Sequence, residues 1–355
     1  MRIGNSRQTY LALLAVLLIT EIAISCTGWA QSSPTAQYHL VKKIVLGGDG
    51  GWDYFTVDPA THNIFIARGS YVMVLDADGN VTAKMDVGKE NEAHAVAFAH
   101  KLHRAFTSNG GGSSVTIFDP ASLKVINDVK IQDRDTDDIM YEPVTERVFT
   151  FNGGKGHDST AIDAVNGVVV GSIPLEGKPE TAQPDGQGHI FVNIEDKSEL
   201  SEIDAKTLRV LHIWPLAPCK SPSGQAIDTA HSLLIIGCHN GLMEFWDYAS
   251  GKVAGTVPIG QGVDSNRFDP VTGLAFASCG DGTITVAHED APDKFSVVQT
   301  ISTMRGARTM ALDSRNHNVY TVSAEFGPPP APTPKNPHPW PTIKPGTFTL
   351  MIYSR

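Results

Sequence analysis

The sequence predicts an all-β fold, a seven-bladed β-propeller whose blades are four-stranded antiparallel sheets. Two observations support this prediction. A sequence repeat of about forty residues occurs seven times along the chain, and each copy has the pattern of short strands separated by turns. The chain also contains 33 glycines and 22 prolines among its 355 residues. That composition is typical of a protein made of many short strands.

The repeat is clearest at the start of each copy. The segment Asp53-Tyr-Phe-Thr-Val-Asp-Pro59 resembles Asp264-Ser-Asn-Arg-Phe-Asp-Pro270, with a polar residue, an apolar strand and an Asp-Pro turn. The copies begin, at spacings of 41, 43, 43, 43, 41 and 44 residues, with Asp53, His94, Asp137, Glu180, Ser223, Asp264 and Arg308. Solenoids of similar period are helical, whereas these segments are rich in Val, Ile, Phe and Thr and alternate with period two. The repeat therefore indicates blades rather than helical units.

The two ends of the repeat region predict how the ring closes. An open stack of seven blades exposes two sheet edges, which favours closure. The last copy supplies only three strands before Arg355, and residues 38–46 read as an orphan strand ahead of the first copy. We expect the N-terminal strand to complete the last blade and latch the ring shut.

The first thirty residues read as a secretory signal peptide. Arg2 and Arg7 precede the apolar run 11–19, and Gly28-Trp-Ala30 provides small residues before a cleavage site after Ala30. We expect a mature domain at 31–355, located in the periplasm or secreted. Cys26 keeps a second interpretation open, lipidation of the exported chain.

The net charge of −10 disfavours nucleic acid and anionic membranes as partners, because both bind through an excess of Lys and Arg. Glu21 interrupts the N-terminal apolar run, so no membrane span is expected either. We expect a monomer whose partner is a small molecule or another protein.

The repeat resembles the YVTN-repeat, YncE-like family of exported bacterial propellers. The resemblance covers essentially the whole mature chain and rests on Asp58-Pro59, Phe118-Asp-Pro-Ala-Ser122, Gly177-Lys-Pro-Glu180 and the ending Pro345-Gly-Thr-Phe-Thr-Leu350. The literal Tyr-Val-Thr-Asn tetrapeptide is absent. The resemblance implies a WD40-like propeller fold and general ligand binding, and it implies no particular chemistry.

Polar residues at equivalent blade positions predict a site at the mouth of the central channel. The first row consists of the seven residues that begin the copies, from Asp53 to Arg308. A second row, after the second strand of each blade, includes Arg68, Asn109 and Asn152. Concave clusters of convergent polar groups are the usual binding sites, so we predict a ligand-binding ring of Asp53, His94, Asp137, Glu180, Asp264, Arg308, Arg68, Asn109 and Asn152.

The chemistry of this ring stays open at the level of sequence. His94, Asp53 and Glu180 are candidate ligands for a divalent metal, but no HExxH or calcium-loop motif occurs and no local motif draws three ligands together. A metal-assisted lyase or lactonase using the acidic ring and His94 is the alternative to simple binding. A protein-interaction scaffold is the second alternative. No catalytic residue is assigned.

Two further features complete the predictions. Cys219, Cys238 and Cys279 remain in the mature chain, and a Cys219–Cys238 disulfide is preferred over a Cys238–Cys279 bond. The proline-rich segment 326–346 interrupts the last blade between its second and third strands. We expect it to form a stiff rim or lid over the channel, with Trp340 or His338 facing inward.

Overall fold

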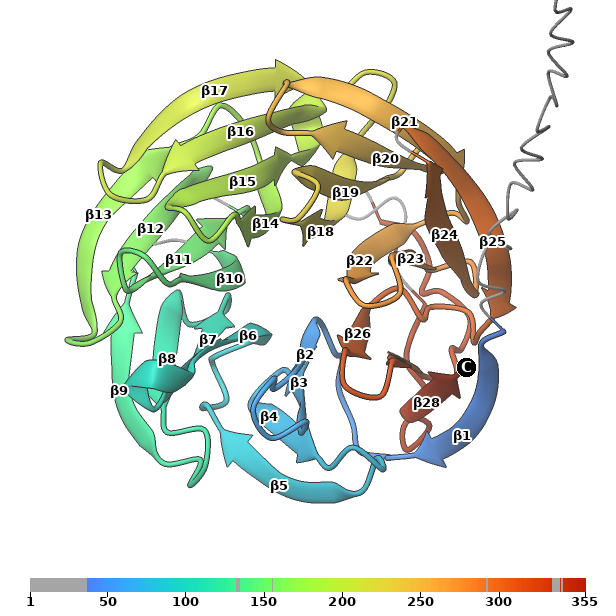
Figure 1. Cartoon of the computed structure of the whole chain (residues 1–355). Coiled ribbons are helices and arrows are strands. Elements are labelled where there is room, and N and C mark those ends of the chain that lie inside the picture. Colours follow the sequence, from blue (N-terminus) through green and yellow to red (C-terminus); the bar gives the residue numbers. More distant parts are fainter. Residues whose placement is uncertain (1–36, 132–134, 155, 292, 334–338, 340) are drawn as a thin grey trace, which may run out of the picture. The chain divides into compact units, whose positions relative to one another are not determined.

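The computed structural model describes residues 37–131, 135–154, 156–291, 293–333, 339 and 341–355. These residues form seven four-stranded antiparallel sheets arranged in a ring (Figure 1). Two short 3₁₀ helices, η1 (His100–Leu102) and η2 (Glu195–Lys197), interrupt the strands. The predicted seven-bladed propeller is confirmed, and its period of about forty residues is one blade.

Each of the first six blades is built from four consecutive strands, with the first strand of the four at the channel and the fourth at the rim. In blades 1 to 3 the strands are β2 (Phe55–Val57), β3 (Ile64–Arg68), β4 (Tyr71–Leu75), β5 (Val81–Asp86), β6 (Ala93–Ala99), β7 (Arg104–Asn109), β8 (Ser114–Phe118), β9 (Val125–Lys130), β10 (Thr136–Glu142), β11 (Arg147–Asn152), β12 (Asp158–Asp163) and β13 (Val168–Pro174). In blades 4 to 6 they are β14 (Pro179–Pro184), β15 (His189–Ile194), β16 (Glu199–Asp204), β17 (Arg209–Pro215), β18 (Pro222–Asp228), β19 (Leu233–Cys238), β20 (Leu242–Asp247), β21 (Lys252–Pro258), β22 (Val263–Asp269), β23 (Leu274–Cys279), β24 (Thr283–Ala291) and β25 (Lys294–Ser302).

The seventh blade joins the two ends of the chain. Its strands are β26 (Met310–Asp313), β27 (Asn318–Ser323), β28 (Thr349–Ser354) and, at the rim, β1 (His39–Val45). Strand β1 pairs antiparallel with β28 (Figure 1). The predicted N-terminal latch is therefore confirmed, and it covers the edge that β28 would otherwise expose.

The core lies between neighbouring blades and between the sheets' inner strands. Large aromatic side chains such as Phe106, Phe149 and Phe276 are fully buried there. Ring closure is part of this packing, because Tyr38 stacks edge-on against Phe276 of blade 6 at 5.4 Å between ring centroids. No helix in the part of the chain that the structure describes is long and apolar enough to cross a membrane.

Candidate functional site at the channel mouth

β-Bulges place the ring residues on the channel wall. In five blades the pairing of the innermost strand with the second strand shifts at the ring residue, so that this residue has no direct cross-strand partner. The residues concerned are His94, Asp137, Glu180, Ser223 and Asp264. A bulge bends the strand and re-aims its side chain, and it recurs near functional sites. The repeat thus delivers one polar side chain per blade to one end of the channel.

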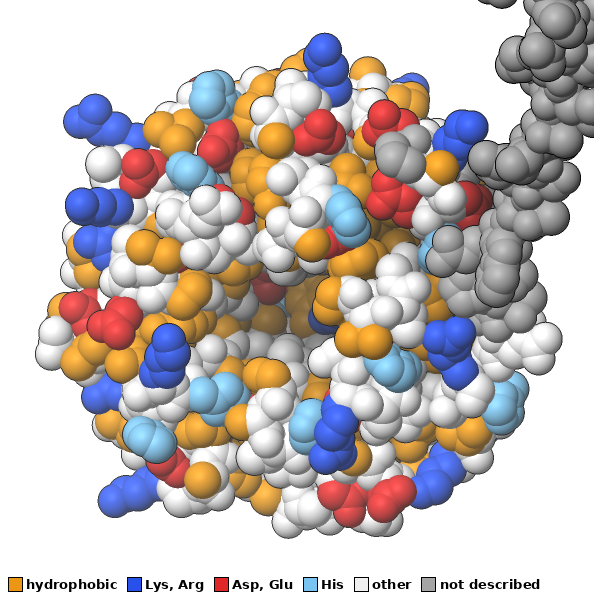
Figure 2. All heavy atoms as spheres, viewed as in Figure 1, with side chains coloured by type: hydrophobic (Ala, Val, Ile, Leu, Met, Phe, Trp, Pro, Cys, Tyr) orange, Lys and Arg blue, Asp and Glu red, His pale blue; other side chains and the backbone are white. Residues whose placement is uncertain are grey.

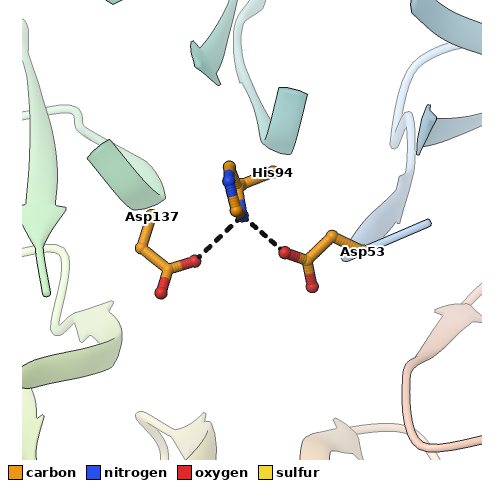
Figure 3. Close-up of side chains that lie close together, drawn as sticks. All are labelled: Asp53, His94 and Asp137. Atoms are coloured by element: carbon orange, nitrogen blue, oxygen red, sulfur yellow. Dashed lines mark hydrogen bonds and ion pairs between the residues drawn. The ribbon is translucent and has the colours of Figure 1, made fainter. Parts of the chain in front are cut away.

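Asp53, His94 and Asp137, from three successive blades, converge on one point (Figure 3). The Nδ1 atom of His94 lies 2.6 Å from Asp53 Oδ2 and 3.4 Å from Asp137 Oδ1. One nitrogen and two carboxylate oxygens lie within 4.8 Å of one another. The three side chains are 20 %, 20 % and 27 % exposed, so the cluster is sheltered by protein but still reached by solvent.

The two aspartates hold His94 in its charged form. Burial by itself lowers the pKa of His94, but the hydrogen bonds and negative charges of Asp137 and Asp53 outweigh it and raise the pKa to about 11. Burial raises the pKa of Asp53 to about 6, against the opposing effect of the His94 hydrogen bond and charge. At neutral pH an imidazolium proton therefore supplies the positive charge that the two carboxylates require.

Arg308 joins a second group of ring residues. Its Nε lies 2.6 Å from Asp264 Oδ2, and its Nη2 lies 3.9 Å from Asp53 Oδ1. Tyr54 and Ser223 both donate hydroxyl hydrogen bonds to the other oxygen of Asp264, at 3.3 and 3.2 Å. Arg308 therefore lies between two acidic ring residues, Asp264 and Asp53, and neutralises them.

Glu180 belongs to a third group and not to the metal-ligand cluster. It pairs with Lys178, which also contacts Glu195 at 2.7 Å. Burial, reinforced by the charge of Asp137, raises the pKa of Glu180 well above its usual value, although Lys178 opposes the rise. Among the described residues, the group of possible ligand atoms within 4.8 Å of one another contains Asp137 beside Asp53 and His94, and it does not contain Glu180, the third candidate that the sequence suggested.

The second row does not face the channel mouth. Asn109 and Asn152 are fully buried, and their amides donate to side chains of the same blade, Asn109 to Ser114 and Thr116, Asn152 to Asp158 and Thr160. Arg68 is 2 % exposed, lies 3.8 Å over the Phe348 ring and donates to the backbone of residues 49 and 50. These three side chains, which the sequence suggested as ligand-binding residues, are therefore buried and contact other parts of the protein.

Sequence reasoning missed Tyr54, Lys178 and Glu195. Tyr54 follows a ring residue directly and Lys178 precedes one by two positions, so proximity to the aligned position was the available signal. Glu195 lies in η2, where nothing in the repeat pattern marks it. Lys178 and Glu195 meet Glu180 within blade 4, and Tyr54 of blade 1 reaches Asp264 of blade 6.

The cysteines and the proline-rich segment lie near the same end of the blades. Cys219 and Cys238 form a disulfide with a Cα–Cα distance of 5.5 Å, and Cys279 is a buried free thiol. The segment 326–346 runs between β27 and β28, and its two ends pair with each other, with Gly327 N–H donating to Thr342 O at 2.8 Å. Trp340 and His338, the predicted lid residues, lie outside the described residues.

Figure 2 shows one face of the propeller, and this face is hollowed at the axis of the ring. The inner strands surround that axis (Figure 1), so side chains on them border a solvent-reached channel rather than a solid core.

Comparison with known proteins shows the fold and nothing finer. No family model and no curated protein matches the chain. A chain in the crystal structure of the mitotic checkpoint complex superposes with a TM-score of 0.72 at 12 % identity, covering 99 % of both chains. A chain of Kuenenia stuttgartiensis hydrazine synthase superposes with a TM-score of 0.66 at 16 % identity, covering 76 % of this chain and 92 % of that one.

These likenesses define a seven-bladed propeller. In all, 1841 chains of solved structures match, so the architecture is shared far too widely to indicate one activity. Propellers commonly serve as interaction scaffolds, and the site itself must carry any more specific argument.

Proposed function

We propose that this chain is an exported binding propeller of the YVTN-repeat type and that its channel mouth holds a divalent metal ion. The observation that carries the proposal is the convergence of Asp53, His94 and Asp137 within 4.8 Å. Imidazole nitrogen together with carboxylate oxygen suits a first-row transition metal such as Zn²⁺, whereas Ca²⁺ and Mg²⁺ prefer oxygen ligands alone. Three protein ligands leave open coordination positions on the channel side.

The proton on His94 is the competitor of the metal. His94 must lose this proton before Nδ1 can coordinate, and its pKa near 11 makes that loss costly at neutral pH. A divalent ion offsets this cost because its two positive charges neutralise both aspartates. The imidazolium carries only one positive charge for the same two carboxylates. Metal affinity should therefore increase as the pH rises, with about one proton released for each ion bound.

The test is elemental analysis of the purified mature protein, followed by calorimetric titration of Zn²⁺ into chelator-treated protein. We expect about one ion per chain, a lower melting temperature after chelation, and proton release seen as a dependence of the heat on the buffer. The variant His94→Ala should lose the ion. The matched control is His231→Ala, because His231 forms a 2.6 Å pair with Asp228 and belongs to no group of three possible ligands among the described residues.

Equal Zn²⁺ binding by the wild type and His94→Ala would overturn the proposal, as would the absence of any bound ion together with a melt that chelator leaves unchanged. Both results would leave a binding propeller without a metal at Asp53, His94 and Asp137.

A metal-assisted lyase or lactonase is the second candidate, and the same cluster favours it. A divalent ion with three protein ligands and an open position can activate water or polarise a carbonyl. The side-chain exposure of 20–27 % in the cluster leaves room for a solute to approach. Turnover of lactones or cyclic esters by the metal-loaded protein, lost in His94→Ala, would support an enzyme. Binding without turnover supports the binding propeller.

A further inference from the structure

Arg267 reaches into the channel away from the mouth ring. It lies on β22, the inner strand of blade 6, three residues beyond the ring residue Asp264. Its Nη1 donates to Asn266 O at 2.7 Å, and its Nη2 approaches Phe55 O of blade 1 at 3.5 Å. Blade 7 separates blades 6 and 1 in the ring (Figure 1). The guanidinium must therefore pass on the channel side of blade 7.

This guanidinium has no carboxylate partner. Among the residues that the structure describes, no Asp or Glu oxygen lies within 4.0 Å of Arg267, whereas Arg308 at the mouth is paired with Asp264 at 2.6 Å. The carboxyl group whose charge acts on Arg267 belongs to Asp138 of blade 3. Asp138 accepts the backbone N–H of Ala182 at 3.1 Å, and it acts on Arg267 through its charge without a contact inside 4.0 Å.

An unpaired guanidinium in a protein-walled channel is costly to the fold. Burial lowers the pKa of Arg267, which reflects the loss of water around its charge. A guanidinium carries five N–H donors, and the contacts with two neutral backbone carbonyls use only two of them. The N–H groups that no protein atom accepts are available to an acceptor from solution.

We propose that Arg267 binds a small carboxylate that enters the channel, with the free N–H groups of the guanidinium fork holding its two oxygens. The fork geometry of arginine matches a carboxylate, which accepts two parallel hydrogen bonds. The backbone contacts to Asn266 and Phe55 orient the fork before the ligand arrives. The site is separate from the metal cluster at the mouth and does not depend on it.

The probe is acetate, and the readout is the melting temperature of the whole mature protein in a buffer of low ionic strength without carboxylates. We expect acetate to raise the melting temperature saturably by a few degrees, because a ligand that binds only the folded state stabilises it by mass action. Chloride at equal concentration should raise it less. In Arg267→Met the acetate effect should disappear.

The apo stability of the same variant separates a binding role from a structural one. An unpaired charge replaced by an apolar chain of similar length should leave the melting temperature in acetate-free buffer unchanged or raised. Arg305→Met is the matched control, since Arg305 is exposed, and it should keep the full acetate effect.

Three results would overturn the proposal: equal acetate shifts in the wild type and Arg267→Met, equal shifts with acetate and chloride, or no shift in the wild type. Metal content should be the same in the wild type and Arg267→Met, so this test fails or succeeds independently of the metal cluster.

Discussion

At the scale of single residues, the channel mouth is governed by how its charges are paired. Asp53 and Asp137 share one imidazolium, and Asp264 is satisfied mainly by Arg308. Like charges placed this close by the seven-fold repeat would repel one another without these cations. The pairing keeps the ring compact, and His94 is the member whose charge a change of pH removes.

We predict that the melting temperature falls as the pH rises from about 6.5 toward 11, and that His94→Gln flattens this fall. The pKa of His94 is about 11 in the folded protein against an ordinary value of 6.5, so its stabilising contribution is complete below pH 6.5 and is lost as the pH rises through the folded pKa. Melts of chelator-treated protein between pH 6.5 and 9.5 test this prediction.

The raised pKa of Asp53, about 6, acts in a lower window. Titration of Asp53 lowers the stability as the pH rises from about 4 to 6, and its effect no longer changes above that range. It therefore does not contribute to the slope of the melting temperature above pH 6.5. His231→Gln serves as the control, because its imidazole is exposed and water screens its pair with Asp228. A pH profile that is the same in the wild type and His94→Gln would contradict the prediction.

At the scale of elements, side chains of one blade hold the bulged backbone of the next. Ser108 donates to the carbonyl of Asp137, and the amide of Asn193 donates to the carbonyl of Ser223 at 2.8 Å. These donors lie on second strands and are fully buried. Each of these side chains contacts the next blade rather than the channel. The bulge takes the carbonyl of the ring residue out of the strand pairing, and the side chain supplies the hydrogen bond that this carbonyl lacks.

The disulfide is an element-scale constraint in blade 5, and we predict that it contributes about 3 kcal/mol to the free energy of unfolding. It joins two cysteines 19 positions apart in the sequence, one at the entry to β18 and one at the end of β19. Cys219→Ser should lower the melting temperature, and reduction of the wild type should lower it equally. A thiol titration of the denatured, unreduced mature chain should find one thiol, that of Cys279, and a count of three would contradict the bond.

At the scale of the whole molecule, the fold depends on closing the ring. Strand β1 pairs with β28 over six positions, and Tyr38, which directly precedes β1, donates its hydroxyl to the backbone carbonyl of His317 at 3.0 Å. Blade 7 contacts both blade 6 and blade 1, so its outer strand supports two interfaces. Cooperative unfolding should therefore depend on contacts between the two ends of the chain. Tyr38 and His317, for example, are 279 residues apart in the sequence.

We predict that a variant starting after Gly48 loses the cooperative thermal transition or melts at a much lower temperature, because the edge of β28 becomes exposed and the Tyr38 contacts are lost. The matched control is a chain starting at Gln31, which retains β1. Calorimetry of the two chains is the measurement, and identical melts would refute the latch.

The amino-acid sequence alone determined the architecture. A period of about forty residues, strand-like alternation and an orphan N-terminal strand specify seven blades and their closure, because these are local patterns repeated along the chain. The order of charges around the ring also follows from the repeat, so the position of Arg308 between Asp264 and Asp53 was predictable.

Only the tertiary structure decided which ring residues meet. Asp137 rather than Glu180 joins Asp53 and His94, because Lys178 draws Glu180 into another group. The burial of Asn109, Asn152 and Arg68 likewise depends on the direction in which each side chain leaves its strand. Both outcomes depend on bulges and on contacts between blades, and neither a bulge nor an interblade contact leaves a periodic signal in the sequence.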